Sequence, residues 1–263
     1  MTVLAGLLLV LALATILWLC SVRVEDASIA DIWWGPGFAI LAWFYAIRSP
    51  VPAWRPIVLA IFVTLWGARL GLHIARRHRG AGEDRRYGAM RARHGTAFWW
   101  RSHFTVFWLQ GILLWFVALP LFAASRRAAP AGVPWTDIAG VALFAAGFAF
   151  ETVGDHQLTR FRAVASNRGR VLDSGLWRYT RHPNYFGDAL LWWGVYVLSA
   201  AVPGAWTMIA SPIAMTVLLL RVSGVTLLEA QLTVSKPAYK DYIARTSAFV
   251  PWRPRRTAAK LHS

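Results

Sequence analysis

Long apolar runs, separated by short polar segments, repeat along most of the 263 residues. The runs fall at about 3–22, 29–47, 56–75, 104–124, 137–157, 187–203 and 206–228. A helix that crosses a bilayer needs about 20 consecutive apolar residues. The pattern therefore predicts an all-α, polytopic transmembrane helical bundle of about seven spans. The first run has no basic segment before it, so we expect a span there rather than a cleaved signal peptide.

The polar segments indicate how the bundle is oriented. Most of the 28 Lys and Arg residues lie in three hydrophilic stretches, residues 76–101, 158–188 and 229–263. With seven spans, all three stretches lie on one side, and the positive-inside bias makes that side the cytoplasm. We therefore expect an outside N-terminus, a cytoplasmic C-terminus and a multi-pass protein of a cytoplasmic membrane.

Composition excludes several classes of protein. With 57% hydrophobic and 15% charged residues, the chain has too few polar residues to cover a water-soluble domain of this size. The net charge of +16 is not spread over an amphipathic surface, which argues against nucleic acid as a partner and leaves the lipid bilayer. Cys20 is the single cysteine, so it forms no intrachain disulfide and has no cysteine partner for a metal site.

The polar segment at residues 151–188 carries the candidate chemistry. It reads ETVGDHQLTRFRAVASNRGRVLDSGLWRYTRHPNYFGD. Glu151 and Asp155 are four residues apart and share one helical face, where they line a pocket or pair with an arginine. Four arginines follow between residues 160 and 170, and guanidinium groups suit bidentate phosphate binding. Membrane topology and lipid headgroups explain part of this charge equally well.

Aromatic and amide side chains follow directly. Trp177, Tyr179, Asn184 and Tyr185 offer stacking surfaces and donors of the kind that hold a nicotinamide or adenine ring. His182 has no second histidine at ligand spacing, so we expect no metal site. The sequence also has no GxGxxG after a strand and no P-loop, which excludes the usual soluble nucleotide-binding folds.

Several of these strings resemble a known family. NRGRVLDS, GLWRYTRHPNYFGDALLWWG and LLEAQLTVSKPAYKDYIARTSAFVPW are similar to the C-terminal domain of the steroid 5-alpha-reductase superfamily, especially its bacterial branch. DIWWGPGF, LWGARLGLHIARR and GEDRRY extend the resemblance over most of the chain. It implies N-terminal transmembrane helices on the substrate side (1–125), a reductase-like transmembrane domain with the cofactor site (126–252) and a basic tail (253–263).

The resemblance also implies a cofactor and its site. Sterol reductases of this superfamily bind NADPH among their last helices and cytosolic loops. Matching motif positions gives these cofactor-binding residues: Arg69, Asp155, Arg162, Leu172, Trp177, Tyr179, Asn184, Tyr185, Tyr239 and Tyr242. Hydride transfer to a C=C bond needs a proton donor, and Asp188 and Glu229 are the catalytic candidates, because burial at a membrane edge raises a carboxyl pKa.

One departure bears on the substrate. Steroid 5-alpha reductases polarise the substrate carbonyl with a glutamate and a tyrosine in the N-terminal half, whereas Trp66 occupies the place of that tyrosine here. Asp31 or Tyr45 could substitute. The expected substrate is therefore a lipid-like enone, of which a steroid is one example.

Two other functions remain open. Isoprenylcysteine carboxyl methyltransferases and phospholipid methyltransferases also carry an RHPxY turn and a late glutamate, but S-adenosylmethionine has no phosphate that would use the four arginines. A non-enzymatic lipid-binding protein would explain the basic loops and not the acidic residues beside the helices. The stretch 76–101 either caps the cofactor or rests on headgroups.

Overall fold

The chain folds into helices, as its apolar pattern predicts. The computed structural model describes residues 3–51, 53–129, 131–222 and 225–255, and within them no strand forms. One isolated bridge joins Thr180 to Ser247. The described residues divide between two compact units, which are treated separately below: unit 1 (Met1–Gly132 with Leu198–Ser211) and unit 2 (Val133–Val197 with Pro212–Ser263).

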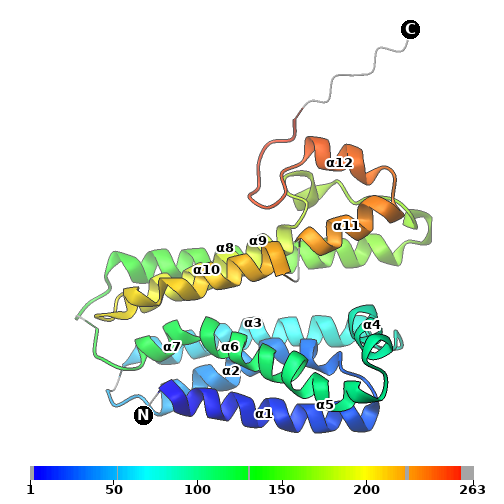
Figure 1. The fold of residues 1–263 in the computed structure, drawn as a ribbon. Coiled ribbons are helices and arrows are strands. Elements are labelled where there is room, and N and C mark those ends of the chain that lie inside the picture. The colour runs from blue at the N-terminus through cyan, green and yellow to red at the C-terminus, as the bar shows by residue number, and fades with distance from the viewer. Residues whose placement is uncertain (1–2, 52, 130, 223–224, 256–263) are drawn as a thin grey trace. The chain divides into compact units, whose positions relative to one another are not determined.

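Unit 1 is a set of helices that lie side by side (Figure 1). Its helices are α1 (Val3–Val24), α2 (Ile29–Ile47), α3 (Trp54–His78), α4 (Arg85–His94), the continuous run of α5 (Phe98–Ser102), the π-helical η2 (His103–Trp108) and α6 (Leu109–Val117), then α7 (Leu119–Ala124) and the short η5 (Ala205–Ile209). Helices α2 and α3 pack most closely, because Gly35 and Gly67 face each other. A Cβ atom on Gly35 would lie 2.4 Å from the carbonyl oxygen of Gly67, so neither position has room for a side chain.

Unit 2 contains the second half of the chain. Its helical segments are α8 (Trp135–Ala163), η3 (Ala165–Asn167), η4 (Gly175–Arg178), most of α9 (Pro183–Ser199), most of α10 (Ala210–Val217), the π-helical η6 (Leu218–Val222), α11 (Val225–Ser235) and α12 (Tyr239–Arg245). Pro183 opens α9, where its missing N–H costs nothing. The sequence predicts one apolar run at 206–228, but this region forms several short helices in the structure.

A seam of glycines brings α8 and α9 together. Gly147 and Gly154 in α8 are seven residues apart, as are Gly187 and Gly194 in α9. A Cβ atom on Gly147 would lie 2.4 Å from the backbone nitrogen of Leu191, so the two backbones touch with no side chain between them. Small residues at such crossings are typical of helix pairs in membranes. The seam fixes the start of α9, which carries part of the site described below.

By length and composition, three of the described helices could cross a membrane. Helices α1, α3 and α8 are long and apolar enough to cross a bilayer, and the segment Ala205–Arg221 is a shorter apolar helix. The expectation of a helical transmembrane protein is confirmed at that level. The count of seven spans and the orientation of the termini stay predictions.

The basic stretch 76–101 folds back onto unit 1. Its loop docks on the turn between α1 and α2, where Glu83 accepts a hydrogen bond from the Ala27 amide (2.9 Å) and Ser28 Oγ accepts one from the Asp84 amide (2.8 Å). His78 Nε2 lies 2.6 Å from Asp26 Oδ2. These contacts hold the loop in place, so α4 is an integral part of unit 1.

Candidate functional site

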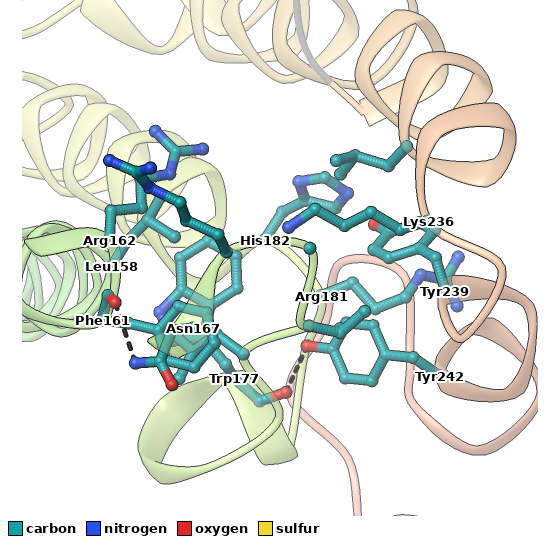
Figure 2. A pocket seen from close by; sticks show the side chains of 15 residues that line it. Leu158, Phe161, Arg162, Asn167, Trp177, Arg181, His182, Lys236, Tyr239 and Tyr242 are labelled. Atoms are coloured by element: carbon teal, nitrogen blue, oxygen red, sulfur yellow. Dashed lines mark hydrogen bonds between the residues drawn. The ribbon is translucent and has the colours of Figure 1, made fainter. Parts of the chain in front are cut away.

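An open cavity of about 180 Å³ lies in unit 2, and we call it the aromatic cavity (Figure 2). Its wall comes from the end of α8, the loop to α9, α11 and α12. The lining residues are Leu158, Phe161, Arg162, Asn167, Arg168, Gly169, Val171, Leu172, Trp177, Arg181, His182, Leu232, Lys236, Tyr239 and Tyr242. Aromatic side chains and several cations thus surround one space.

Hydrogen bonds to the backbone hold the floor of the aromatic cavity. Trp177 is buried, and its indole Nε1 donates to the Gly154 carbonyl of α8 at 3.1 Å. Gln157 Oε1 accepts from the Leu176 amide at 3.0 Å, beside Gly175 with its φ of +61°. Tyr242 donates its hydroxyl proton to the Trp177 carbonyl, as the dashed line in Figure 2 shows. The loop is therefore fixed to α8 on one side and to α12 on the other.

A buried ion pair ties α11 to the start of α9. Arg181 donates to Glu229 through Nε (2.7 Å) and NH2 (3.1 Å), and its NH1 group donates to the carbonyls of Ile243 (3.1 Å) and Thr246 (2.6 Å). This bidentate geometry is the strong form of an arginine–carboxylate pair. The guanidinium of Arg181 is thus fully engaged within the protein.

His182 shares the carboxylate of Glu229. Its Nε2 atom lies 3.0 Å from Glu229 Oε1, and its ring stacks on Tyr185 with the planes 4° apart. A carboxylate partner assigns the proton to Nε2. The side chain is 1% exposed and Nδ1 has no hydrogen-bond partner among the described residues, so an acceptor lone pair is buried in the wall of the aromatic cavity.

The charge of the aromatic cavity is one-sided. Arg162, Arg168 and Lys236 line it, whereas no aspartate or glutamate is among its lining residues. Burial, followed by the nearby charge of Arg162, lowers the pKa of Lys236. Figure 2 shows Arg162 and Lys236 on opposite sides of the space. Arg162, Arg168 and Lys236 thus bring positive charge to one space, which suits an anionic ligand.

Two tyrosines contribute neutral phenols. Burial raises the pKa of Tyr239 and that of Tyr242 well above the ordinary value. Tyr242 uses its proton within the protein, whereas the hydroxyl of Tyr239 makes no hydrogen bond with the described residues. Tyr239 can therefore donate a hydrogen bond to a ligand.

The aromatic cavity brings together part of the cofactor site expected from the sequence. Of the expected residues, Arg162, Leu172, Trp177, Tyr239 and Tyr242 line it. Sequence reasoning did not assign Arg181, His182 or Lys236 to this wall. The RHPNY string pointed to the first two, whereas no local signal marks Lys236, which directly follows α11.

The other expected residues lie elsewhere. Asn184 donates its amide to Asp155 Oδ1 (3.1 Å), so this pair joins α9 to α8 outside the lining. Tyr185 stacks on His182, and Tyr179 is 44% exposed at the surface. Asp188 is buried in α9 and does not line the aromatic cavity.

The remaining expected cofactor residue, Arg69, is in α3 of unit 1. Of the expected basic tail 253–263, residues 253–255 are placed, while residues 256–263 lie outside the described part.

The expectation for the pKa of Glu229 was wrong. Although burial raises it, the hydrogen bonds from His182 and Arg181 outweigh burial and hold the pKa of Glu229 below its ordinary value. The sequence suggested burial and gave no sign of these two partners. Glu229 is therefore an anion near neutral pH and positions Arg181 and His182.

Unit 1 contains its own pairing of an acid with a tyrosine. Tyr87 is 5% exposed, donates its hydroxyl proton to Asp31 Oδ1 (2.7 Å) and accepts from Gln110 Nε2 (2.9 Å). Burial, followed by the charge of Asp31, raises the pKa of Tyr87. The sequence suggested Asp31 but missed Tyr87, whose place depends on the docking of α4. The other suggested residue, Tyr45, is buried in α2.

Comparisons with known proteins give a family and a relative. The profile of the family described as "Protein of unknown function (DUF1295)" matches residues 17–246. An uncharacterized protein of Schizosaccharomyces pombe is 27% identical over 277 residues, which cover 94% of this chain and 78% of the yeast protein. No solved structure matches the chain.

Proposed function

The chain belongs to the DUF1295 family, and we propose that it is a membrane-embedded reductase that uses NADPH to reduce a C=C bond in a lipid-like substrate. Residues of the aromatic cavity would hold the cofactor. This proposal agrees with the resemblance to the steroid 5-alpha-reductase superfamily and adds a physical argument from the described residues.

The charge of the aromatic cavity carries the proposal. Arg162, Arg168 and Lys236 line it without a carboxylate, and the lowered pKa of Lys236 reflects burial and repulsion from Arg162. NADPH is a polyanion whose phosphates would relieve that repulsion. S-adenosylmethionine carries a sulfonium cation and would add to it. The observation thus favours the reductase over the methyltransferase alternative.

The remaining lining residues fit the rings of a dinucleotide. Phe161, Trp177 and Tyr239 provide aromatic surfaces, and Tyr239 provides a hydroxyl donor. The volume of about 180 Å³ is below the range typical of whole-ligand pockets, roughly 300–1,000 Å³, so the aromatic cavity would enclose part of the cofactor and leave the rest in the open groove. When bound, NADPH would supply the hydride.

The proton donor that we propose differs from the glutamate that the sequence suggested. Glu229 is anionic and holds Arg181 and His182, so it is a positioning residue. The neutral phenol of Tyr239 is our candidate for the proton donor in its place, and Asp188 stays a candidate from the resemblance.

The proposal includes a membrane arrangement. We propose about seven spans, with the three basic stretches and the C-terminus in the cytoplasm, in a bacterial cytoplasmic membrane. Reporter fusions at the two termini test this orientation, because a reporter active only in the cytoplasm must give signal at the C-terminus alone.

Ligand titration of the detergent-purified chain tests the cofactor. NADPH, NADH and S-adenosylmethionine are titrated separately while apparent thermal stability is followed, because a ligand that binds only the folded state raises it. Arg168 lines the aromatic cavity and Arg160 does not, although both are exposed arginines of unit 2. We expect R168Q to weaken NADPH binding by about ten- to a hundred-fold, the range for a hydrogen bond to a charged group, and R160Q to leave it unchanged.

Each outcome decides between functions. Stabilisation by NADPH that R168Q reduces and R160Q retains supports the reductase. Stabilisation by S-adenosylmethionine alone would overturn it in favour of a methyltransferase. Stabilisation by neither ligand would favour a non-enzymatic lipid-binding protein.

A further inference from the structure

A second cavity of about 370 Å³ lies in unit 2 near the end of the described chain. We call it the arginine cavity. Its lining residues are Arg181, Ile243, Ala244, Arg245, Thr246, Ser247, Ala248, Trp252, Arg253 and Arg255. Arg181 belongs to the walls of both cavities. Nothing in the proposed reductase chemistry uses the other residues.

The segment that forms the arginine cavity is held in a defined shape. The Ser247 carbonyl accepts from the Arg181 amide (2.9 Å), and the Tyr179 carbonyl accepts from the Trp252 amide (2.9 Å). The Thr180 hydroxyl donates to the Phe249 carbonyl at 2.8 Å. The Arg255 amide donates to the Arg245 carbonyl at 2.9 Å. These contacts fold residues 246–255 back on the start of α9. The backbone that carries Arg253 and Arg255 therefore has a defined position in unit 2.

The arginine cavity keeps a positive charge after the ion pairs of the described residues are assigned. Arg181 is satisfied by Glu229 and two carbonyls, and Arg245 forms an ion pair with Asp173. The guanidinium groups of Arg253 and Arg255 make no hydrogen bond or ion pair with the described residues, and no carboxylate is among the described residues that line the arginine cavity. Two guanidinium groups therefore remain for a ligand, and their planar, bidentate geometry suits a phosphate.

The residues around the arginine cavity indicate which class of phosphate compound it binds. Trp252 is 73% exposed and Val250 is 58% exposed, so apolar side chains stand in the open beside the two arginines. Tryptophan next to arginine is the arrangement found where a protein meets headgroups and the first part of the acyl chains. We propose that the arginine cavity binds the phosphate of an anionic phospholipid, with Arg253 and Arg255 as its ligands and Trp252 against the lipid.

Lipid titration of the purified full chain in a neutral detergent tests this proposal. Phosphatidylglycerol, phosphatidylcholine and glycerol 3-phosphate are added separately, and bound lipid is counted by native mass spectrometry alongside apparent thermal stability. We expect phosphatidylglycerol to bind and stabilise, and the two other compounds to have little effect. R253Q/R255Q should weaken this binding about thirty-fold, from the usual contribution of two arginines near an anionic surface.

A matched variant makes the result specific. R160Q/R170Q removes the same charge from exposed arginines of unit 2 that line neither cavity, and we expect it to bind phosphatidylglycerol as the unchanged chain does. An equal loss in both double variants would overturn the proposal, because total charge would then be the cause. Equal binding of phosphatidylcholine would overturn it as well. Equally tight binding of glycerol 3-phosphate would replace the lipid with a soluble phosphate ligand.

Discussion

The carboxylate of Glu229 lies 3.0 Å from Nε2 of His182, although 47 residues separate them in the chain. The same carboxylate accepts from Nε of Arg181 at 2.7 Å. One anion therefore positions two consecutive residues at the start of α9 and connects them to α11. Both residues line the aromatic cavity, so its shape depends on this contact.

Replacement of Glu229 by glutamine should destabilise unit 2. Arg181 is 8% exposed, and E229Q would leave its charge buried without a counter-ion. Loss of one partner from a buried pair costs about 3–5 kcal/mol, and we expect the lower end because Glu229 keeps some exposure. Thermal or denaturant unfolding measures the change. D173N is the control, since the exposed Arg245–Asp173 pair should be worth less than about 1 kcal/mol.

The same carboxylate predicts a pH dependence. Although burial raises it, His182 and Arg181 hold the pKa of Glu229 below its ordinary value of 4.5. The unfolded chain therefore takes up this proton first as the pH falls. The stabilisation is complete above about pH 4.5 and is lost as the pH falls through the lower pKa of the folded protein. Melting temperatures of the unchanged chain and E229Q should converge below that value and differ by a constant amount from pH 5 to 7.

Lys236 should contribute more to NADPH binding than to the stability of the ligand-free protein. Burial and Arg162 lower its pKa, which offsets part of what its hydrogen bond to the Arg170 carbonyl (2.6 Å) contributes to the ligand-free protein. We expect K236M to change the melting temperature little, because the lost hydrogen bond to Arg170 and the relieved repulsion from Arg162 oppose each other. The same variant should weaken NADPH binding about ten-fold, as for one hydrogen bond to a charged group. K240M, on the exposed side of α12, should change neither property. Unaltered NADPH affinity in K236M would count against the cofactor assignment.

The glycine seam predicts opposite effects for two identical substitutions. In G147A the new methyl group would lie 2.4 Å from the Leu191 amide nitrogen and 2.5 Å from the Gly187 carbonyl oxygen. Overpacking of this kind costs about 1–3 kcal/mol. In G88A the methyl group would meet nothing within 4 Å, so helix α4 should gain about 0.5–1 kcal/mol. Unfolding of both variants in the same detergent makes the comparison, and equal effects would refute the close contact.

The sequence predicts the long helices better than their breaks. Continuous apolar runs at 3–22 and 137–157 correspond to α1 and α8. An apolar run of this length without a polar or turn-forming interruption favours one continuous helix over other secondary structure. The run expected at 206–228 forms η5, α10, η6 and α11 instead. Apolar content alone does not reveal where a helix changes to 3₁₀ or π geometry, since packing decides it.

The site was predictable only where neighbours in sequence are neighbours in space. Trp177 and Leu172 belong to one string, and both line the aromatic cavity. Lys236 reaches it across the fold, and the partners of Glu229 are 47 and 48 residues away. The error in the pKa of Glu229 has the same origin, because burial is visible in an apolar pattern and a distant hydrogen-bond donor is not.

The wall of the aromatic cavity has a consequence for biosynthesis. Its first half ends at His182, whereas its second half runs from Leu232 to Tyr242. During translation, α8 and α9 are therefore synthesised, and can pack along their glycine seam, before the segment that completes this wall. A chain that stops before α11 would lack the counter-anion for Arg181, so its buried guanidinium would have no carboxylate partner.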